Sequence, residues 1–339
     1  MQKAAVWLGM ALFIVGVIVL AQPLLLIIGG AIFAVFLDGG TRVLGRYLPI
    51  RRGWRLLLTI VLGFGFLGWV FWFAGTTIAA QFEALREVVT AQFNRLMDFV
   101  GSLGLVPKGE GGTLGTQLLG SVGRLTSAVG SAIGAITSVV AMIVIGIFLA
   151  AEPRIYDRGI AWMLPVRARS GFYRIAEHVG FTLRRLLFGR LVGMVFEGVF
   201  TYVMLTIGGV PMAALLGLVT GVLAFIPNIG AITSGVLMVA VGFSAGPHQG
   251  VYAIFVYFFV QNIDGYLVVP YIARRTVDLP PALVLAMQLL MGALFGILGV
   301  LFADPILASL KVVLVDLSNQ QAAREGEGPE VVAASKAAP

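Results

Sequence analysis

Long apolar runs without a charged residue recur along this chain, and they constrain its fold more than any other feature. Two of them flank Pro227: fifteen residues from Met212 to Ile226 and fifteen from Ile229 to Phe243. Of the 339 residues, 59% are apolar and only 12% are charged, against about 25% charged in a soluble domain. A soluble chain of this length cannot bury so much apolar surface, whereas apolar helices of about 20 residues cross a bilayer. The sequence therefore predicts an all-α, polytopic helical membrane protein.

The positions of the charged residues indicate which side of the membrane each loop occupies. Arginines gather in residues 42–55 and 154–190, whereas residues 83–124 balance four basic against four acidic side chains. Because excess Lys and Arg stay on the cytoplasmic side, we expect the two basic segments inside the cell and the balanced segment outside. The excess of arginine in the cytoplasmic segments then accounts for the net charge of +7. We therefore expect no nucleic acid as a partner. We expect a bacterial inner (cell) membrane protein with both termini cytoplasmic.

The apolar runs and the breaks between them predict a single transmembrane domain over residues 1–317. We expect about eight membrane segments in it, including short, hairpin or re-entrant helices. Four predicted elements have distinctive patterns: a helical hairpin over 6–37 joined at Gln22-Pro23, an outer amphipathic helical hairpin over 82–130, a basic amphipathic helix over 166–190, and a disordered tail over 318–339. The helix over 166–190 is predicted to lie along the inner leaflet against anionic lipid headgroups, and a solvated connecting helix is the alternative.

The segments 212–243 and 281–317 are predicted to be hairpins that each enter and leave the membrane on one side. Fifteen helical residues rise about 22 Å, which is short of the ~30 Å hydrocarbon core. The break at Pro227, Asn228 and Gly230 is then the tip of a re-entrant or deeply inserted hairpin. Irregular backbone at that depth is tolerated only where protein covers it or where it lines a wet cavity. We therefore expect Pro227, Asn228 and Gly230 to help build a substrate site.

The apolar segments contain few polar side chains. Glu197 lies in one segment, and Gln261, Asn262 and Asp264 cluster in another. A charged side chain at the bilayer centre costs at least ~2.5–3.5 kcal/mol, so such groups usually face a cavity, pair with a partner or carry protons. We expect Asp264, and second Glu197, to couple transport to protons or cations, with Gln261 and Asn262 contacting the substrate.

Structural roles are the alternatives for these polar residues. Glu197 could snorkel or pair with Arg190, and Asp264 could accept a hydrogen bond near the inner surface. Gln261 and Asn262 could simply link neighbouring helices, and Asp304 could cap the helix that follows Pro305.

The sequence gives little indication of an enzyme. It contains no Cys, and its two histidines, His178 and His248, fall on different predicted sides of the membrane. Nucleophile elbows, nucleotide-binding loops and zinc-binding helix motifs are absent from the sequence. We therefore expect no catalytic residues, no metal site and no cofactor.

Four sequence blocks resemble the autoinducer-2 exporter family of bacterial membrane proteins, also described as PerM-like permeases. They are "FLAAEP" (148–153), "FIPNIGAI" (225–232), "VQNIDGYLVVPYI" (260–272) and "LPPALVLAMQLLMGALFGILGVLFADPILASLKV" (279–312). The C-terminal third carries the specific likeness. Three positions depart from the family's pattern: Asn228 replaces an aromatic or similar residue, Asp264 a common Glu, and Pro280 a basic or imidazole-bearing residue.

The resemblance implies a transporter that exports small polar molecules, with the signalling furanone autoinducer-2 as the named example. It also implies homo-oligomers, and some members exchange sodium or lithium for protons. We therefore expect export of a small polar solute coupled to the proton gradient. A sodium(lithium)/proton antiporter is the first alternative, and a non-transporting membrane scaffold is the second.

Overall fold

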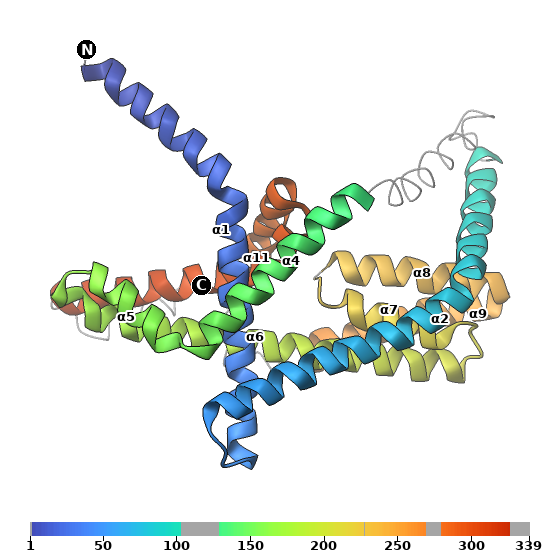
Figure 1. Ribbon diagram of the computed structural model, residues 1–339. Coiled ribbons are helices and arrows are strands. Elements are labelled where there is room, and N and C mark those ends of the chain that lie inside the picture. Colours follow the sequence, from blue (N-terminus) through green and yellow to red (C-terminus); the bar gives the residue numbers. More distant parts are fainter. Residues whose placement is uncertain (1, 103–128, 227, 269–278, 326–339) are drawn as a thin grey trace. The chain divides into compact units, whose positions relative to one another are not determined.

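The chain is helical throughout the part that the structure describes. The computed structural model describes residues 2–102, 129–226, 228–268 and 279–325 (Figure 1). Its elements are α1 (Gln2–Tyr47), α2 (Arg52–Ser102), α4 (Val129–Ala151), α5 (Pro153–Met163), α6 (Val166–Ile207), α7 (Ala213–Leu223), α8 (Ile229–Ala245), α9 (Pro247–Ile263), the π-helical turn η1 (Asp264–Val268) and α11 (Pro281–Glu325). No strand occurs within these ranges, and the predicted all-α class is confirmed.

The helices divide into two compact units. Unit 1 consists of Met1–Thr59, Val139–Leu187 and Arg275–Pro339, and unit 2 of Ile60–Ser138 and Phe188–Arg274. Each unit has its own apolar core. The core of unit 1 is formed by α1, α4, α6 and α11, and its buried residues are Leu25, Ile32, Met142, Leu183, Leu187, Met291, Phe302 and Ala303. The core of unit 2 is formed by α6, α7, α8 and α9 with the α6–α7 connection, and its buried residues are Leu205, Val210, Leu216, Met238, Val241, Ala253, Val256 and Val260.

Helix length and surface chemistry identify a membrane protein. Among the described residues, three helices are long and apolar enough to cross a bilayer: Leu20–Tyr47, Val166–Ile207 and Pro281–Gln321. Thr137–Ala151 and Pro153–Met163 together make a fourth candidate, bent by 88°. Large apolar side chains such as Phe148, Val236 and Leu289 are exposed. Lipid must cover these side chains in the native protein, so the predicted polytopic membrane class is confirmed.

The predicted hairpin over residues 6–37 is wrong. Those residues belong to the single helix α1, which contains Pro23 in its interior. Figure 1 shows α1 changing direction within its first half without turning back on itself. A proline removes one backbone hydrogen bond and bends a helix, but in an apolar solvent the remaining backbone groups favour staying helical. The predicted cytoplasmic N-terminus relied on this hairpin and therefore loses its support.

The predicted surface helix over 166–190 and the membrane span after it are one helix, α6. Its 42 residues rise about 63 Å, twice the ~30 Å hydrocarbon core, so part of α6 must lie outside the hydrocarbon. The first arm of the predicted outer hairpin, from residue 82 onward, continues the unbroken helix α2. The turn of the predicted outer hairpin, within 82–130, lies outside the described residues.

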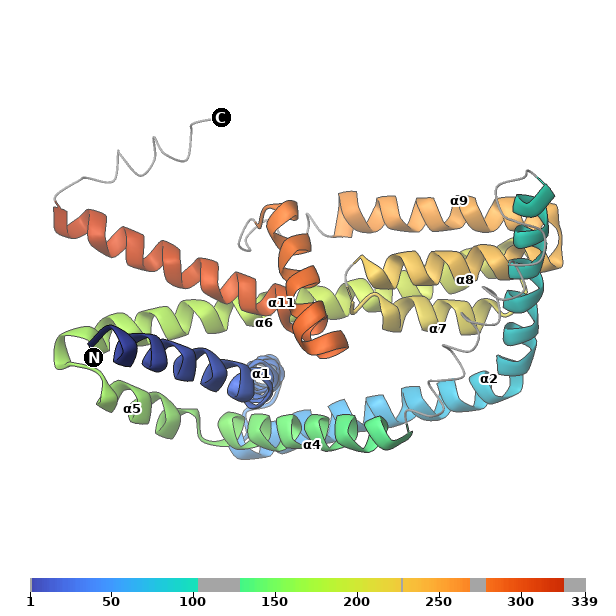
Figure 2. The ribbon, with the colours of Figure 1, turned by 90° about the horizontal axis from the view of Figure 1, so that it is seen from above.

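The segment 212–243 forms the predicted hairpin. The short helices α7 and α8 pack against each other, and α9 runs beside α8 (Figures 1 and 2). A side-chain methyl at Gly230 would overlap the carbonyl oxygen of Leu223, so the two arms meet closely at the tip. Asn228 has a positive φ of 60° at the N-terminus of α8, a conformation that Asn tolerates better than most residues.

The segment 281–317 also forms the predicted hairpin, within α11. The helix is broken at Gly296, where φ is 62° and ψ is −144°. The two arms lie side by side, because Gln288 Nε2 donates a hydrogen bond to Asp304 Oδ1 at 2.9 Å. A methyl at Gly299 would overlap the carbonyl oxygen of Met291. The second arm continues to Glu325, so residues 318–325 are helical and the predicted disorder is wrong for them; residues 326–339 lie outside the described residues.

Candidate functional site

Close helix packing in unit 2 brings polar side chains from distant parts of the sequence together. The contact between α6 and α7 is nearly backbone to backbone: a methyl on Gly217 would lie 2.7 Å from the Gly198 carbonyl oxygen. On the same face, a methyl on Gly221 would lie 2.8 Å from the Met194 carbonyl oxygen. The pair Gly217/Gly221 follows the small-residue spacing that permits such contact between membrane helices.

Glu197 of α6 is the buried carboxylate of this region, with 7% of its surface exposed. Its Oε2 accepts a hydrogen bond of 3.4 Å from Gln261 Nε2 on α9. The contact is long for a hydrogen bond to a charged group. Asp264 and Arg190 both interact electrostatically with Glu197, Asp264 by repulsion and Arg190 by attraction.

Asp264 is the first residue of the π-helical turn that follows α9. Its Oδ1 atom is buried and has no hydrogen-bond partner among the described residues. A methyl on Gly193 of α6 would lie 3.7 Å from this atom, so a glycine faces the carboxylate. Arg190 attracts Asp264 electrostatically. Short π-helical turns of this kind are frequent at functional sites.

The hairpin tip and the Glu197–Asp264 pair lie at the same end of the unit 2 helices. Gly221, near the end of α7, packs against Met194, which precedes Glu197 by one turn. Gly235, near the start of α8, packs against Tyr257, which precedes Gln261 by one turn. The α7–α8 tip therefore reaches the level at which α6 carries Glu197 and α9 carries Gln261.

The structure separates the predicted site residues into two groups. Glu197, Gln261 and Asp264 come together, whereas Asn262 is exposed and donates its Nδ2 to the carbonyl of Phe258, one turn back. Asn228 is exposed at the tip and Gly230 is buried there. Pro227 lies outside the described residues.

Two further polar features escaped the sequence analysis. Thr201 is fully buried, and its hydroxyl has no hydrogen-bond partner in the part of the chain that the structure describes. It follows Glu197 by four residues, as Glu197 follows Gly193, so the three share one face of α6. This spacing of four could have indicated the polar face.

The second missed feature is a charge network in unit 1 centred on Asp38 of α1. The carboxylate binds Arg42 at 2.7 Å, Arg52 at 3.2 Å and Arg184 at 3.3 Å. Arg52 also donates to the carbonyl oxygens of Ala150 and Ala151 at the end of α4. The two basic segments predicted to be cytoplasmic thus meet at one carboxylate, as a shared membrane side requires. Asp304, considered as a helix cap, instead accepts the hydrogen bond from Gln288.

Long lipid-exposed helices, two short helical hairpins and buried ionisable side chains define the class as a polytopic helical membrane protein built like a transporter. The chain belongs to the AI-2E transporter family, because the family's sequence model, described as "AI-2E family transporter", matches residues 8–319. The predicted family is confirmed, and its model describes the members as transporters.

Three curated relatives carry names of the same kind. The "Putative transport protein YueF" of Bacillus subtilis is 28% identical over 155 residues, which are 46% of this chain and 42% of the relative. "Putative transport protein YrrI" of the same bacterium is 23% identical over 168 residues, 50% of this chain and 48% of the relative. A "Putative transport protein" of Thermotoga maritima is 25% identical over 172 residues, 50% of this chain and 53% of the relative. The chain spans about half the length of the curated relatives it matches.

Proposed function

We propose that this transporter exports a small polar solute in exchange for protons, with Asp264 and Glu197 as the coupling carboxylates. The observation that carries the proposal is the pair itself. Two carboxylates repel each other in a mostly apolar helix bundle, one amide bonds only to Glu197, and the buried oxygen atom of Asp264 has no described hydrogen-bond donor. A proton or cation bound by the pair removes that repulsion, so occupancy of the pair can be linked to the membrane gradient.

The solute is proposed to bind at the same end of unit 2, beside the α7–α8 tip. Asn228 offers an amide there, and the N-terminal backbone N–H groups of α8 face the tip, as in transporters whose interrupted helices bind solutes. We assign solute contact to Asn228, Gly230 and Gln261; the sequence also predicts Pro227 as a contact, and Pro227 lies outside the described residues. Asn262 is the weakest member of the set, because its amide is already bonded to its own helix.

The orientation that fits this proposal places the basic segments 42–55 and 154–190 in the cytoplasm. The α11 hairpin then returns the chain to the side from which it entered, which makes the C-terminus cytoplasmic. The N-terminus follows α1 and is not assigned to the cytoplasm. A bacterial inner membrane is the compartment that such an exporter requires.

Flux measurements in proteoliposomes test the proposal. Vesicles that contain the full chain and autoinducer-2 are given a proton gradient, and Asp264→Asn and Glu197→Gln are compared with the wild type. We expect both variants to lose the proton-driven component of export while solute still equilibrates. The control is Asp316→Asn, which removes a carboxylate of unit 1 and should leave coupling intact. Full proton-coupled export by Asp264→Asn would remove this carboxylate from the mechanism.

Sodium/proton exchange is the second candidate function. The side-chain oxygens of Glu197, Asp264 and Gln261 are the hard ligands that sodium prefers, and Thr201 adds a hydroxyl on the same face of α6. A sodium pulse applied to solute-free vesicles would then release protons from wild-type vesicles and not from Asp264→Asn vesicles. Release without any solute would favour the antiporter over the exporter.

A further inference from the structure

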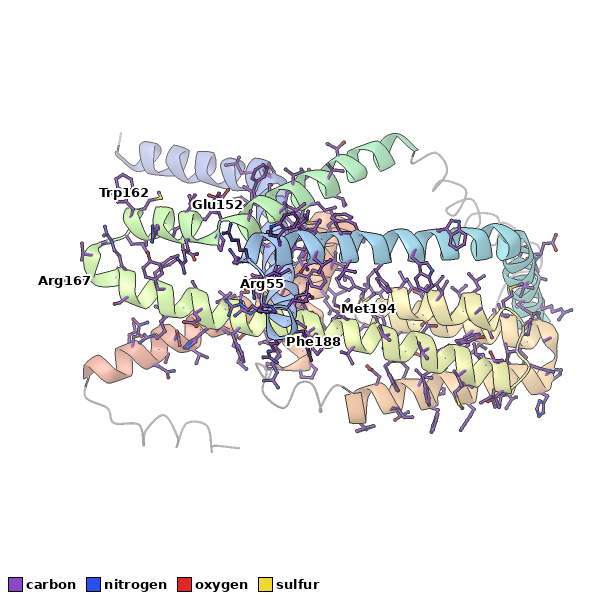
Figure 3. The ribbon with its side chains drawn as sticks, turned by 60° about the horizontal axis from the view of Figure 1, so that its bottom comes forward. Arg55, Glu152, Trp162, Arg167, Phe188 and Met194 are labelled. Carbon is purple, nitrogen blue, oxygen red and sulfur yellow. The ribbon has the colours of Figure 1, made fainter. Side chains whose placement is uncertain are left out.

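Unit 1 contains a pocket that the proposed transport site does not use. It has a volume of about 960 Å³ and lies between α1, the α4–α5 junction and α6. Acidic and basic side chains both line it, among them Asp38, Arg42, Arg52, Arg154, Asp157 and Arg184. Figure 3 marks Glu152, another lining residue, at the junction of α4 and α5.

One wall of the pocket is a closed set of ion pairs and hydrogen bonds. Asp38 is held by Arg42, Arg52 and Arg184, and Arg52 also binds the last carbonyl oxygens of α4. These charges are satisfied within the protein, so they fix the shape of the pocket. Arg42 contributes only its Nε to Asp38, and its two terminal nitrogens have no partner among the described residues.

Charged side chains at the α4–α5 junction and on α5 line the pocket without a partner in the described part of the chain. The side chains of Arg154 and Asp157, both on α5, make no hydrogen bond or ion pair there, and neither does the side chain of Glu152 just before α5. Arg154 and Glu152 are exposed, and Asp157 is half-buried. The side chain of Arg154 and the terminal nitrogens of Arg42 thus lie in one pocket with the unpaired carboxylate of Asp157.

The other side of α5 is apolar and exposed. Ile160, Trp162 and Met163 are all at least half exposed, Trp162 by 78% and Met163 by 79%. Figure 3 shows Trp162 standing clear of the α5 ribbon. Because α5 bends by 88° from α4, a membrane-crossing α4 places α5 along the bilayer surface. A short helix in that position turns its apolar face to acyl chains, with Trp at the interface.

We propose that this pocket binds the phosphoethanolamine headgroup of a phospholipid. Arg42 and Arg154 bind the phosphate, Asp157 binds the ammonium group, and the acyl chains cover the exposed apolar face of α5. Guanidinium groups suit phosphate because their donors match its oxygen atoms. A purely anionic headgroup would meet repulsion from Asp157 and Glu152, so the mixed charges favour a zwitterion. The apolar face of α5 favours a lipid over a soluble zwitterion.

Lipid titration of the full chain, followed by native mass spectrometry, tests this inference. Delipidated protein in detergent is titrated with dioleoyl phosphatidylethanolamine and, separately, with dioleoyl phosphatidylglycerol. We expect the wild type to bind phosphatidylethanolamine more tightly. Asp157→Asn and Arg154→Gln should each weaken that binding about fivefold, the effect of one partly exposed ion pair. Asp157→Asn should also reduce or abolish the preference over phosphatidylglycerol.

Arg158→Gln is the matched control, because Arg158 lies on α5 but does not line the pocket. It should bind both lipids as the wild type does. Thermal unfolding of all three variants should match the wild type, since the replaced side chains have no described partners. Equal phosphatidylethanolamine binding by wild type and Asp157→Asn would overturn the headgroup assignment. Displacement of the lipid by an equal concentration of free phosphoethanolamine would overturn the lipid assignment in favour of a soluble zwitterion.

Discussion

Asp38 in unit 1 and Asp264 in unit 2 are both carboxylates on apolar helices, but their surroundings are opposite. Asp38 accepts bonds from three guanidinium groups, and its side chain is 19% exposed. Asp264 has a buried oxygen without a described donor and a second carboxylate, Glu197, within electrostatic range. A carboxylate that the protein satisfies is part of the architecture, whereas one left unsatisfied is available to a proton, a cation or a solute.

The comparison of Asp38 with Asp264 is informative only if the two units are packed in the same way and differ in their charges. Each contains a hairpin closed by a glycine that meets backbone, Gly299 in unit 1 and Gly230 in unit 2. Because the obstacle is a carbonyl oxygen and cannot rotate away, Gly299→Ala and Gly230→Ala should each cost about 3 kcal/mol or more. Unfolding in one detergent, followed by circular dichroism, measures both losses.

Gly53→Ala in unit 1 and Gly65→Ala in unit 2 are the controls for these hairpins. A methyl at either position meets nothing within 4 Å. Both substitutions should be neutral or stabilising by up to about 1 kcal/mol, as alanine is in a helix. Wild-type stability of Gly230→Ala would show that the α7–α8 tip is looser than its contacts indicate, and the two units would then differ in more than charge.

The charge comparison itself predicts unequal effects of the same chemical change. Asp38→Asn leaves Arg184, 18% exposed, without its ion pair and should cost about 2–3 kcal/mol. Asp264→Asn removes a repulsion and breaks no described hydrogen bond, so it should change stability by less than about 1 kcal/mol. Thermal unfolding of the two variants, measured under the same conditions, shows which substitution costs more stability. A larger loss for Asp264→Asn would reverse the assignment of structural and functional carboxylates.

The two hairpins were predictable from sequence because each break is local. Proline and glycine interrupt uncharged runs at Pro227 and Gly296. The same reasoning failed at Pro23, where the proline bends α1 without ending it. A break in pattern shows where a helix is weakest, but packing and solvent decide whether the chain turns there.

The sequence predicted which residues belong to the candidate site, but it did not predict which of them contact one another. Burial cost alone singles out Glu197 and Asp264 in apolar segments. The hydrogen bond between Glu197 and Gln261 joins residues 64 positions apart. The Asp38 network was missed for the same reason, because Arg184 is 146 positions away. Charges near segment ends were taken as topology signals, and no local pattern shows which of them meet in space.

Gly193 offers a change that should affect function without affecting stability. The methyl group of Gly193→Ala would lie 3.7 Å from Asp264 Oδ1, which is an ordinary van der Waals distance. It should exclude water or a cation from that side of the carboxylate and lower proton-driven flux several-fold, with unfolding unchanged. Gly265→Ala is the control, since a methyl there meets nothing within 4 Å. Equal flux in both variants would mean that the space beside Asp264 is not used.

The smallest loss of stability is expected from a substitution at Asp316. This carboxylate is ion-paired, like Asp38, but its partners are more exposed, so it tests whether burial or charge pairing makes Asp38 more important for stability than Asp264. Asp316 forms ion pairs with Arg174 at 3.8 Å and with His178 at 3.2 Å, but those partners are 52% and 53% exposed. Asp316→Asn should therefore cost less than about 1 kcal/mol. Since solvent ions screen exposed pairs, the loss should vanish at 1 M salt, whereas the loss in Asp38→Asn should persist. If both losses respond equally to salt, the Asp38 network is more accessible to water than its side chains indicate, and the contrast with Asp264 would no longer follow from burial.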